Sequence, residues 1–293
     1  MGSVRLRDRA FVGLQYLLPQ HLLSSVVYRL TRSRSRWLKD ALIGAFMRAF
    51  RPDMSDAEVG DPHAYASFNA FFTRALRAGA RPPPAQAQAI ASPVDGTVSQ
   101  AGELREDRLY QAKGHDYTLG ELLAESTQSV EQFRGGRFAT IYLAPFNYHR
   151  IHMPLDGQLS GAWHVPGSLF SVNQQTAALV PGLFARNERI ICLFESAAGP
   201  FALVLVGALF VGSMRTVWHG EVTPRRAGGP SPLTPDPHVP LLLPRGAEMA
   251  RFNMGSTVIL LLPPGRACWR ADFGAGQLVR VGECLGQLLP APP

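Results

Sequence analysis

The chain has 293 residues, and 46% of them are hydrophobic, which excludes a chain that is disordered throughout and allows a sizeable core. Its 29 basic and 22 acidic residues give a net charge of +7, nearly all of it on arginine, because only Lys39 and Lys113 are lysines. Arginine suits phosphate and carboxylate partners, so the charge fits nucleic acid, an anionic membrane or a codon preference and selects none of them.

The first fifty residues carry apolar side chains at helical spacing, which predicts short amphipathic helices on both sides of Pro19. Arginines lie between the apolar stripes, and Tyr28 and Trp37 are candidate interfacial aromatics. Such helices either dock on a membrane surface or pack their stripes on the protein's own core, and the pattern alone does not decide between the two. The two clearest stripes are Leu22, Leu23, Val26, Val27 and Leu30, and Leu38, Leu42, Ile43, Phe46, Met47 and Phe50.

The sequence carries few signs of targeting or of covalent cross-links. No apolar run reaches the roughly 18 residues of a membrane-spanning helix, and the N-terminus has no signal-peptide layout. The three cysteines form no Cys-x-x-Cys pair, which argues against a zinc site and a disulfide framework and favours a reducing compartment. We therefore expect a cytoplasmic protein without a transmembrane anchor.

Residues 81–88 are rich in proline and glutamine, which predicts an extended connection between a helical region, residues 1–80, and a second domain, residues 90–293. Proline-rich residues 224–244 predict a surface loop rather than an element. The expected fold class is α+β, with N-terminal amphipathic helices followed by a mostly β core. Apolar and β-branched runs predict strands at residues 138–143, 190–194, 201–211 and 256–262.

Three short segments place reactive side chains among glycines, prolines and aromatic residues. Alone, Asp95 fits a turn, and Gly255 with Ser256 fits the entry to a strand. His149 and His152 are spaced to share a helix face, but no third ligand is spaced to complete a metal site, so we expect no metal. Each segment therefore has a structural explanation when it is taken alone. The segments are residues 92–96, 148–154 and 252–257.

Taken together, the three segments supply the side chains of a nucleophilic relay. In chain order, Asp95, His152 and Ser256 can act as orienting acid, general base and nucleophile, with Asp95 fixing the tautomer of His152. The spacing of the three residues does not show that they meet in space.

The three segments, in this order and at these separations, resemble the motifs of the phosphatidylserine decarboxylases. The resemblance covers roughly residues 65–290, and the N-terminal helices are similar in character rather than in letters. Met254 replaces the commoner leucine before the Gly-Ser-Thr sequence, which is a volume-conserving change. Further matching segments are Phe71–Arg74, Pro166–Asn173, Leu183–Ile190, Val206–Ala208 and Val211–Met214.

The resemblance implies a precursor that cuts itself between Gly255 and Ser256 into a large β chain and a small α chain. Ser256 would become a covalent pyruvoyl cofactor, which forms a Schiff base with phosphatidylserine and releases carbon dioxide to give phosphatidylethanolamine. His152, oriented by Asp95, would activate Ser256. His149 is the first candidate for the proton donor to the substrate, and its alternative is a structural role.

The resemblance also implies partners and a place in the cell. Phosphatidylserine in an anionic membrane is the expected substrate, the two cleaved chains would stay associated, and no nucleic acid is expected. The lipid substrate favours membrane docking by the basic helices, hence a peripheral protein on the cytoplasmic side of the cell membrane. A homodimer is left open.

Three other functions fit parts of the sequence. A pyruvoyl-dependent decarboxylase of a soluble amino acid would share every self-cleavage residue, although the basic amphipathic helices argue against it. A serine hydrolase would use Asp95, His152 and Ser256 on outside substrates, but it would leave Gly255 unexplained. A noncatalytic binder of anionic lipid or nucleic acid would use the arginines alone.

Overall fold

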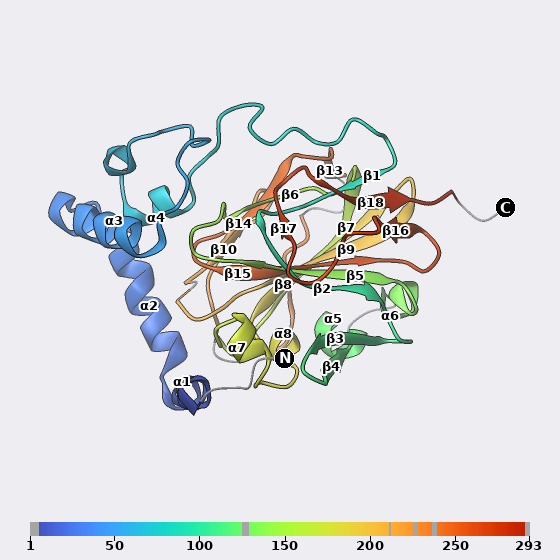
Figure 1. The fold of residues 1–293 in the computed structure, drawn as a ribbon, viewed down its shortest axis with the longest axis horizontal. Coiled ribbons are helices and arrows are strands. Elements are labelled where there is room, and N and C mark those ends of the chain that lie inside the picture. Colours follow the sequence, from blue (N-terminus) through green and yellow to red (C-terminus); the bar gives the residue numbers. More distant parts are fainter. Residues whose placement is uncertain (1–5, 125–128, 211, 226–227, 236–238, 291–293) are drawn as a thin grey trace.

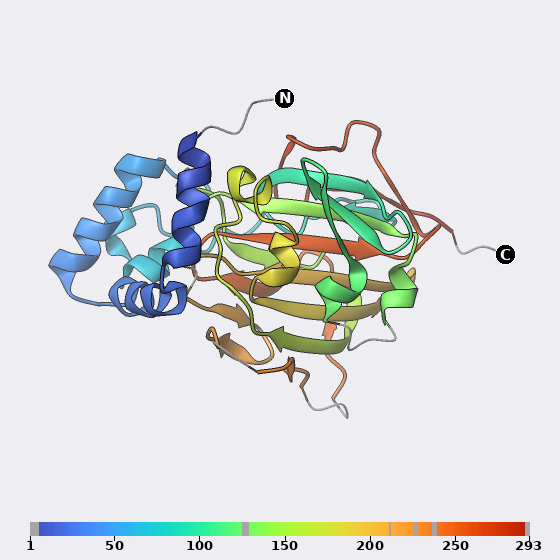
Figure 2. The same ribbon diagram turned by 90° about the horizontal axis from the view of Figure 1, so that it is seen from below.

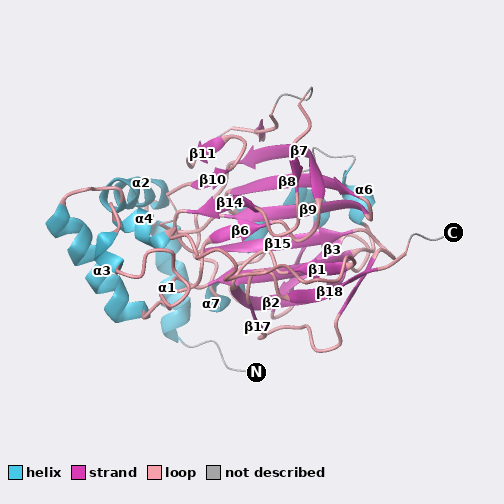
Figure 3. Ribbon diagram, turned by 90° about the horizontal axis from the view of Figure 1, so that it is seen from above, coloured by secondary structure: helices cyan, strands magenta, loops and turns pink. Residues whose placement is uncertain are grey.

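The computed structural model describes residues 6–124, 129–210, 212–225, 228–235 and 239–290. In this part of the chain the N-terminal helices gather at one end of a β core, as Figures 1 and 3 show, so the expected α+β class is confirmed. The helices are α1 (Leu6–Leu17), α2 (Gln20–Thr31), α3 (Arg36–Phe50), α4 (Phe68–Phe72), α5 (Leu119–Leu123), α6 (Ser129–Phe133), α7 (Gln174–Ala177) and α8 (Leu183–Arg186), with a 3₁₀ turn η1 at Pro62–Ala64.

A nine-stranded antiparallel sheet forms the centre of the described core. Strand β15 lies between β9 and β5 near its middle, and every residue of β15 is buried. A strand buried on both faces reads as a continuous apolar run, which explains the sequence Val-Ile-Leu-Leu-Leu after Thr257. The order is β12 (Ser231–Pro232), β7 (Gly157–Val165), β8 (Arg189–Ser196), β9 (Gly199–Val206), β15 (Ser256–Leu262), β5 (Arg137–Leu143), β2 (Gly96–Glu103) and β17 (Leu278–Val279), and β13 (Leu242–Leu243) also pairs with β7.

Smaller elements cover both faces of this sheet. One face carries a four-stranded and a three-stranded sheet, and the other carries the short helices α5, α7 and α8 with a β-hairpin (Figures 1 and 2). Apolar side chains from these layers join one continuous core. The covering strands are β11 (Gly220–Val222), β10 (Met214–Thr216), β14 (Glu248–Phe252) and β6 (Arg150–His152), then β1 (Ala89–Ala91), β18 (Cys284–Leu288) and β16 (Ala267–Trp269), and in the hairpin β3 (Arg108–Ala112) and β4 (His115–Thr118).

Three of the four predicted strands are confirmed as β5, β8 and β15. The prediction of a strand over residues 201–211 is wrong beyond Val206, because Gly207 leaves the ladder and Phe210 takes a left-handed conformation with φ of 68°. The prediction that residues 224–244 hold no element is also wrong, since β12 and β13 pair with β7 at its open edge.

The N-terminal helices use their apolar residues in two different ways. Helix α3 buries Ile43 and Phe46 against the phenylalanines of α4, which is ordinary core packing. Helix α2 does the reverse: it buries Ser24 and Thr31, while Leu22, Val26 and Leu30 are exposed. These three leucine and valine side chains, 44–55% exposed and four residues apart, form one outward stripe that we call the α2 ridge.

Helix α1 repeats this inverted pattern. It buries Val12 and Gln15 but leaves Leu14 and Leu17 exposed. The buried amide of Gln15 accepts a hydrogen bond from the backbone N–H of Ser171 at 2.7 Å, so polar contacts attach the inner face of α1 to the core. No helix in the described ranges is long and apolar enough to cross a bilayer.

Candidate active site

The sheet brings Asp95 and Ser256 to the same end of the core. Ser256 begins β15 opposite Leu143 of β5, and Tyr142 of β5 lies opposite both Thr257 and Thr97 of β2. Asp95 comes directly before β2, so it lies two strands from Ser256, roughly 10 Å away at the usual strand spacing. This end of β15 points towards the N-terminal helices (Figure 2).

Backbone hydrogen bonds attach the histidine segment to the other two motif segments. The N–H of His152 donates to the carbonyl of Pro93 at 2.8 Å, two residues before Asp95. Phe252, four residues before Ser256, donates its N–H to the carbonyl of His149 at 3.0 Å. The structure therefore brings together the three segments that the sequence singled out.

The hydroxyl of Ser256 is buried, and among the described residues its Oγ has no hydrogen-bond partner. Buried hydroxyls normally make hydrogen bonds, so the unpaired hydroxyl of Ser256 is unusual. Beside it, Gly255 is open: a Cβ placed there would meet only the carbonyl oxygen of Leu143, at 3.5 Å. The structure thus offers a free nucleophilic oxygen next to an unhindered peptide carbonyl.

His152 is held in one tautomer by two contacts. Its Nδ1 lies 2.7 Å from the carbonyl oxygen of Gly246, so Nδ1 carries the proton and donates it. Its Nε2 lies 3.0 Å from the hydroxyl of Tyr148, which must then donate to it. Burial lowers the pKa of His152, and burial also raises the pKa of Tyr148, so both groups are neutral near pH 7. The basic lone pair of His152 is therefore at Nε2.

His149 is in the opposite tautomer and in a drier environment. It is fully buried, and its ring stacks on Phe72 of α4 with centroids 4.1 Å apart. Its Nε2 lies 3.2 Å from the carbonyl oxygen of Pro145 and donates to it, while Nδ1 has no hydrogen-bond partner within the described ranges. Burial lowers the pKa of His149 to about 3, so the ring is neutral with a free lone pair at Nδ1.

The carboxylate of Asp95 is held by an arginine rather than by His152. Arg81 donates from Nε to Oδ1 at 3.2 Å and from Nη2 to Oδ2 at 2.9 Å, and Asp56 anchors the same guanidinium at 2.7 Å. The N–H of Val281 donates to Oδ1 at 2.7 Å. In the described structure the direct Asp95–His152 bond of the predicted relay is not formed, because both ring nitrogens of His152 and both oxygens of Asp95 are bonded elsewhere.

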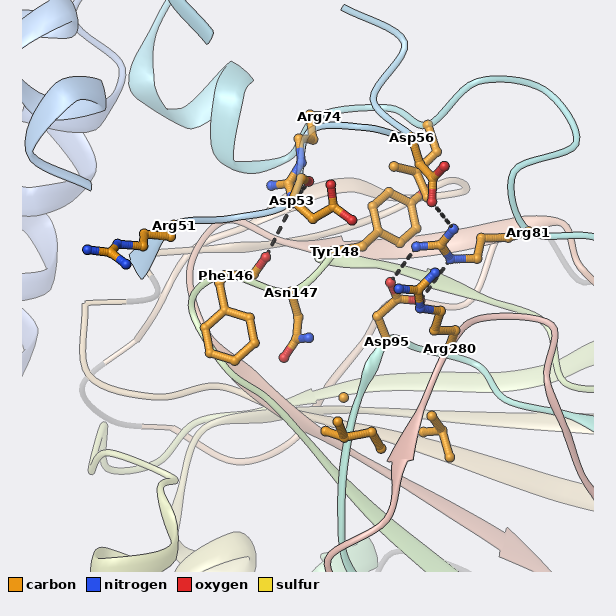
Figure 4. Close-up of a pocket in the computed structure, with 14 residues that line it drawn as sticks. Arg51, Asp53, Asp56, Arg74, Arg81, Asp95, Phe146, Asn147, Tyr148 and Arg280 are labelled. Carbon is orange, nitrogen blue, oxygen red and sulfur yellow. Dashed lines mark hydrogen bonds and ion pairs between the residues drawn. The ribbon is translucent and has the colours of Figure 1, made fainter. Parts of the chain in front are cut away.

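A cavity of about 280 Å³ opens beside Asp95 (Figure 4). Charged side chains of both signs line it together with Tyr148, and the arginines outnumber the aspartates. They are Arg51, Arg74, Arg81 and Arg280, and Asp53, Asp56 and Asp95. Burial lowers the pKa of Arg74, which shows how far this arginine is withdrawn from water. Arginines at a small cavity are suited to phosphate or carboxylate.

Sequence reasoning missed Arg81 and Tyr148, and only Tyr148 had a signal. Tyr148 is the first residue of the histidine segment, and its hydroxyl contacts His152, four residues later in the same segment. Arg81 stands at the start of the proline-rich connection, far in sequence from its partner Asp95, so spacing could not pair them.

Side chains from three other parts of the fold hold the segment before Ser256. Asn253 donates from Nδ2 to Ser213 Oγ at 2.5 Å and to Glu221 Oε1 at 3.2 Å. Asn69 of α4 donates to the carbonyl of Asn253 at 3.3 Å, and Met254 packs on the phenylalanine cluster of α4. The segment before Ser256 is thus fixed against the helical end of the molecule.

The chain is similar to known proteins over nearly its full length. Residues 68–287 match the family model described as Phosphatidylserine decarboxylase, and residues 10–51 match a second model described as PSD. The phosphatidylserine decarboxylase proenzyme of Methylococcus capsulatus is 51% identical over 286 residues, which cover 95% of this chain and 96% of that protein. The proenzymes of Pseudomonas paraeruginosa and Nitrosococcus oceani are each 50% identical, over 95% and 98% of this chain and 97% and 94% of their own. The resemblance inferred from the motifs is confirmed, and the chain belongs to the phosphatidylserine decarboxylase family.

Proposed function

We propose that this chain is a phosphatidylserine decarboxylase precursor that cleaves itself between Gly255 and Ser256. The observation that carries the proposal is the buried Oγ of Ser256, which lacks a hydrogen-bond partner among the described residues and follows an open glycine carbonyl. Buried hydroxyls are usually bonded, and in the described chain Ser256 differs from the equally unbonded Thr257 in directly following the open glycine.

In the proposed cleavage, Ser256 Oγ attacks the carbonyl carbon of Gly255, and the peptide bond becomes an ester. A base must take the hydroxyl proton, and Nε2 of His152 is the proposed acceptor because it carries the lone pair. Loss of the Ser256 Cα proton with departure of the Gly255 carboxylate then separates residues 1–255 from residues 256–293. Hydrolysis of the resulting dehydroalanine releases ammonia and leaves a pyruvoyl group at residue 256.

Tyr148 occupies the Nε2 of His152 in this structure, so the hydroxyl must turn away or pass a proton on before His152 can act as the base. Asp95 is proposed to stabilise the positive charge that forms on His152. This role needs proximity rather than a direct bond: burial lowers the pKa of His152, and the nearby charges of Glu248 and Asp95 act against that shift.

A pyruvoyl group fits this place in the structure, because it would be made from the atoms of Ser256 itself. When formed, this carbonyl group withdraws electrons from the bond that breaks as carbon dioxide leaves the substrate. His149 is proposed to serve the substrate: it is neutral at pH 7, and its unbonded Nδ1 can accept a proton and return it. The arginine-lined cavity beside Asp95 is the proposed place for the anionic groups of the lipid.

The exposed α2 ridge supports a lipid substrate over a soluble amino acid. Apolar side chains four residues apart would face water at a cost of about 25 cal/mol per Å² of exposed area, whereas a bilayer interface would bury them. Trp37, 75% exposed on α3, is suited to the same interface. Peripheral attachment of the N-terminal helices to the membrane is therefore part of the proposal.

A denaturing mass spectrum of the purified protein tests the cleavage. We expect a piece ending at Gly255 and a piece of residues 256–293 with a blocked N-terminus, and an uncleaved 31.9-kDa chain for Ser256→Ala. Thr257→Val is the matched variant, because the hydroxyl of Thr257 is also buried and unbonded within the described part of the chain. We expect Thr257→Val to be cleaved normally, and cleavage that survives Ser256→Ala would refute the assignment. Release of carbon dioxide from phosphatidylserine, and none from free serine, tests the substrate.

A further inference from the structure

A row of neighbouring residues runs across the sheet from Ser256 to a buried glutamate. Thr257 of β15 pairs with Val206 of β9, so Gly207 lies beside Ser256. The N–H of Gly207 donates to the carbonyl of Glu188 at 2.8 Å, which places Glu188 next in the row. None of these contacts belongs to the cleavage chemistry described above.

The side chains of Ser256 and Glu188 lie on the same face of the sheet. Two residues further along, Val258, Leu205 and Ile190 pair across the same three strands, and His164 of β7 pairs with Ile190. Residues two apart on a strand share a face, so Ser256, Glu188 and His164 point to one side. The next residue, Arg189, donates to the carbonyl of Leu122 in α5 on the opposite face.

Glu188 and His164 form a buried pair. Oε1 of Glu188 lies 2.6 Å from Nε2 of His164, and the two side chains are only 2% and 1% exposed. Glutamate is rarely buried this deeply, and among the described residues Nδ1 of His164 has no partner. A pair that only tied β7 to β8 would do so at lower cost with two apolar side chains, so the carboxylate calls for a functional reason.

Gly207 has no side chain, and the carboxylate of Glu188 lies beside the place that a side chain would take. A Cβ at Gly207 would lie 3.8 Å from Oε2 of Glu188 and 3.8 Å from the terminal methyl of Met214. The Cβ atoms of directly opposite residues are about 5 Å apart, so that same point is about 5 Å from Cβ of Ser256. Gly207 thus contributes no side chain to the row between Glu188 and Ser256, and the methyl of Met214 lies beside the same point.

We propose that Glu188, held by His164, binds the ammonium group of the serine head group and takes one proton from it. The inference rests on the proposed function, since only a mature decarboxylase presents a carbonyl at residue 256. The proton moves from the substrate nitrogen to Oε2 of Glu188, and no other bond changes. The nitrogen gains the lone pair that it needs to attack a carbonyl, and the carboxylate loses its charge in a site that is short of water.

The proposal separates Glu188 from self-cleavage, because Ser256 Oγ carries no ammonium group. Glu188→Gln keeps the shape and the acceptor for His164 but removes the charge, and Glu188→Asp keeps the charge. Glu195→Gln on the same strand is the matched control, since Glu195 is exposed. We expect every variant to mature as the wild type does, measured by mass spectrometry.

Equilibrium binding to the mature protein is the first readout. The probes are dihexanoyl phosphatidylethanolamine, which carries the ammonium group, and dihexanoyl phosphatidylglycerol, which lacks it. Glu188→Gln should weaken binding of the first probe by about ten- to a hundredfold, as expected for a hydrogen bond to a charged group, and leave the second unchanged. Glu188→Asp should recover part of the loss, and Glu195→Gln should match the wild type.

The pH profile of turnover is the second readout. The deficit of Glu188→Gln in kcat/KM should shrink as pH rises from 7 to 9, because the substrate amine then loses its proton to water. An unchanged preference for the ethanolamine probe, or a deficit independent of pH, overturns the proposal. So does failure of both Glu188→Gln and Glu188→Asp to mature, which would move Glu188 to folding or self-cleavage. Wild-type protein that neither matures nor turns over phosphatidylserine would instead overturn the proposed function.

Discussion

Arg32, which caps the C-terminus of α2, and Asn253, three residues before Ser256, donate hydrogen bonds to the same carboxylate oxygen of Glu221. Ser213 lies between them: it accepts from Arg32 at 2.9 Å and donates to Glu221 at 2.5 Å. Tyr28 of α2 donates to the second oxygen of Glu221 at 3.3 Å. The helix that carries the exposed ridge is therefore bonded, through the side chain of Glu221, to the segment in which the cut is proposed.

Replacing Glu221 with alanine should slow self-cleavage, because Arg32 and Asn253 lose a shared acceptor and the Gly255 carbonyl loses its fixed position. We expect the half-life of the precursor to lengthen about tenfold, followed by gel electrophoresis after a pulse of synthesis. The precursor half-life of Glu221→Gln, which keeps an acceptor oxygen, should lie between those of the wild type and Glu221→Ala. Arg48→Ala on α3 is the control, since its guanidinium bonds only within its own helix among the described contacts. Unaltered maturation of Glu221→Ala would remove this network from the cleavage step.

Arg81 should matter to maturation through Asp95. In Arg81→Met the carboxylate loses both guanidinium bonds and keeps the N–H of Val281, so it is less firmly held near His152. We expect maturation to slow by about tenfold or more, and Arg81→Lys to recover part of the rate with one donor in place of a fork. Arg108→Met, which breaks the exposed pair with Asp116, should mature normally. Normal maturation of Arg81→Met would show that Asp95 needs no anchor.

The buried His149 should make the precursor less stable in mild acid. Its pKa is about 3 in the folded chain and near 6.5 when unfolded, so between these values only the unfolded chain binds the proton. The free energy of unfolding should therefore fall as pH drops below about 6.5, by up to about 1.4 kcal/mol per pH unit from this group. Urea unfolding of the uncleaved Ser256→Ala protein at pH 7, 6 and 5 measures the slope. Adding His149→Gln should flatten it, and an equal slope in both proteins would contradict the assigned burial.

The α2 ridge should control membrane attachment. Leu22→Ser with Val26→Ser should reduce sedimentation with vesicles of phosphatidylglycerol and phosphatidylethanolamine by about tenfold. The double variant lacks two aliphatic side chains that would otherwise be buried in the bilayer interface. Leu242→Ser is the control, because this leucine is 68% exposed on β13, away from the helices. Self-cleavage should continue in the double variant. Equal sedimentation of the double variant and the control would argue against docking through α2.

The sequence predicted the elements whose side-chain pattern reflects their own burial. Strand β15 is buried along its whole length and reads as an unbroken apolar run, so its position was predictable from residue 256 onwards. The helical spacing around Leu22 and Val26 also predicted α2, but not its orientation. Helical spacing of apolar residues shows only that one face of a helix differs from the other. The surrounding structure shows that the polar face of α2 is the inner one.

The motifs predicted that the segments of Asp95, His152 and Ser256 belong to one site, but not which side chains contact one another. Tyr148 contacts His152 within one segment, Arg81 reaches Asp95 across a connection, and the row from Glu188 to Ser256 crosses two strand pairings. Such contacts depend on sheet register, which no single segment encodes. The predicted Asp95–His152 pairing shows the same limit, because nothing in the spacing pointed to Arg81 as the partner of Asp95.

The position of β15 between β9 and β5 means that the proposed cut is made at the edge of the molecule's most deeply embedded strand. The short product would supply β15 to the middle of the large sheet, β17 to its end, and β16 and β18 to the sheet that holds β1. It would have no fold of its own to return to. Before the cut, unfolding is a reversible event within one chain; after it, the same event would release a strand-forming peptide into solution, and recovery would need two molecules to meet and interleave. Maturation would thus turn a protein protected by its equilibrium stability into one protected only by the slowness of its unfolding.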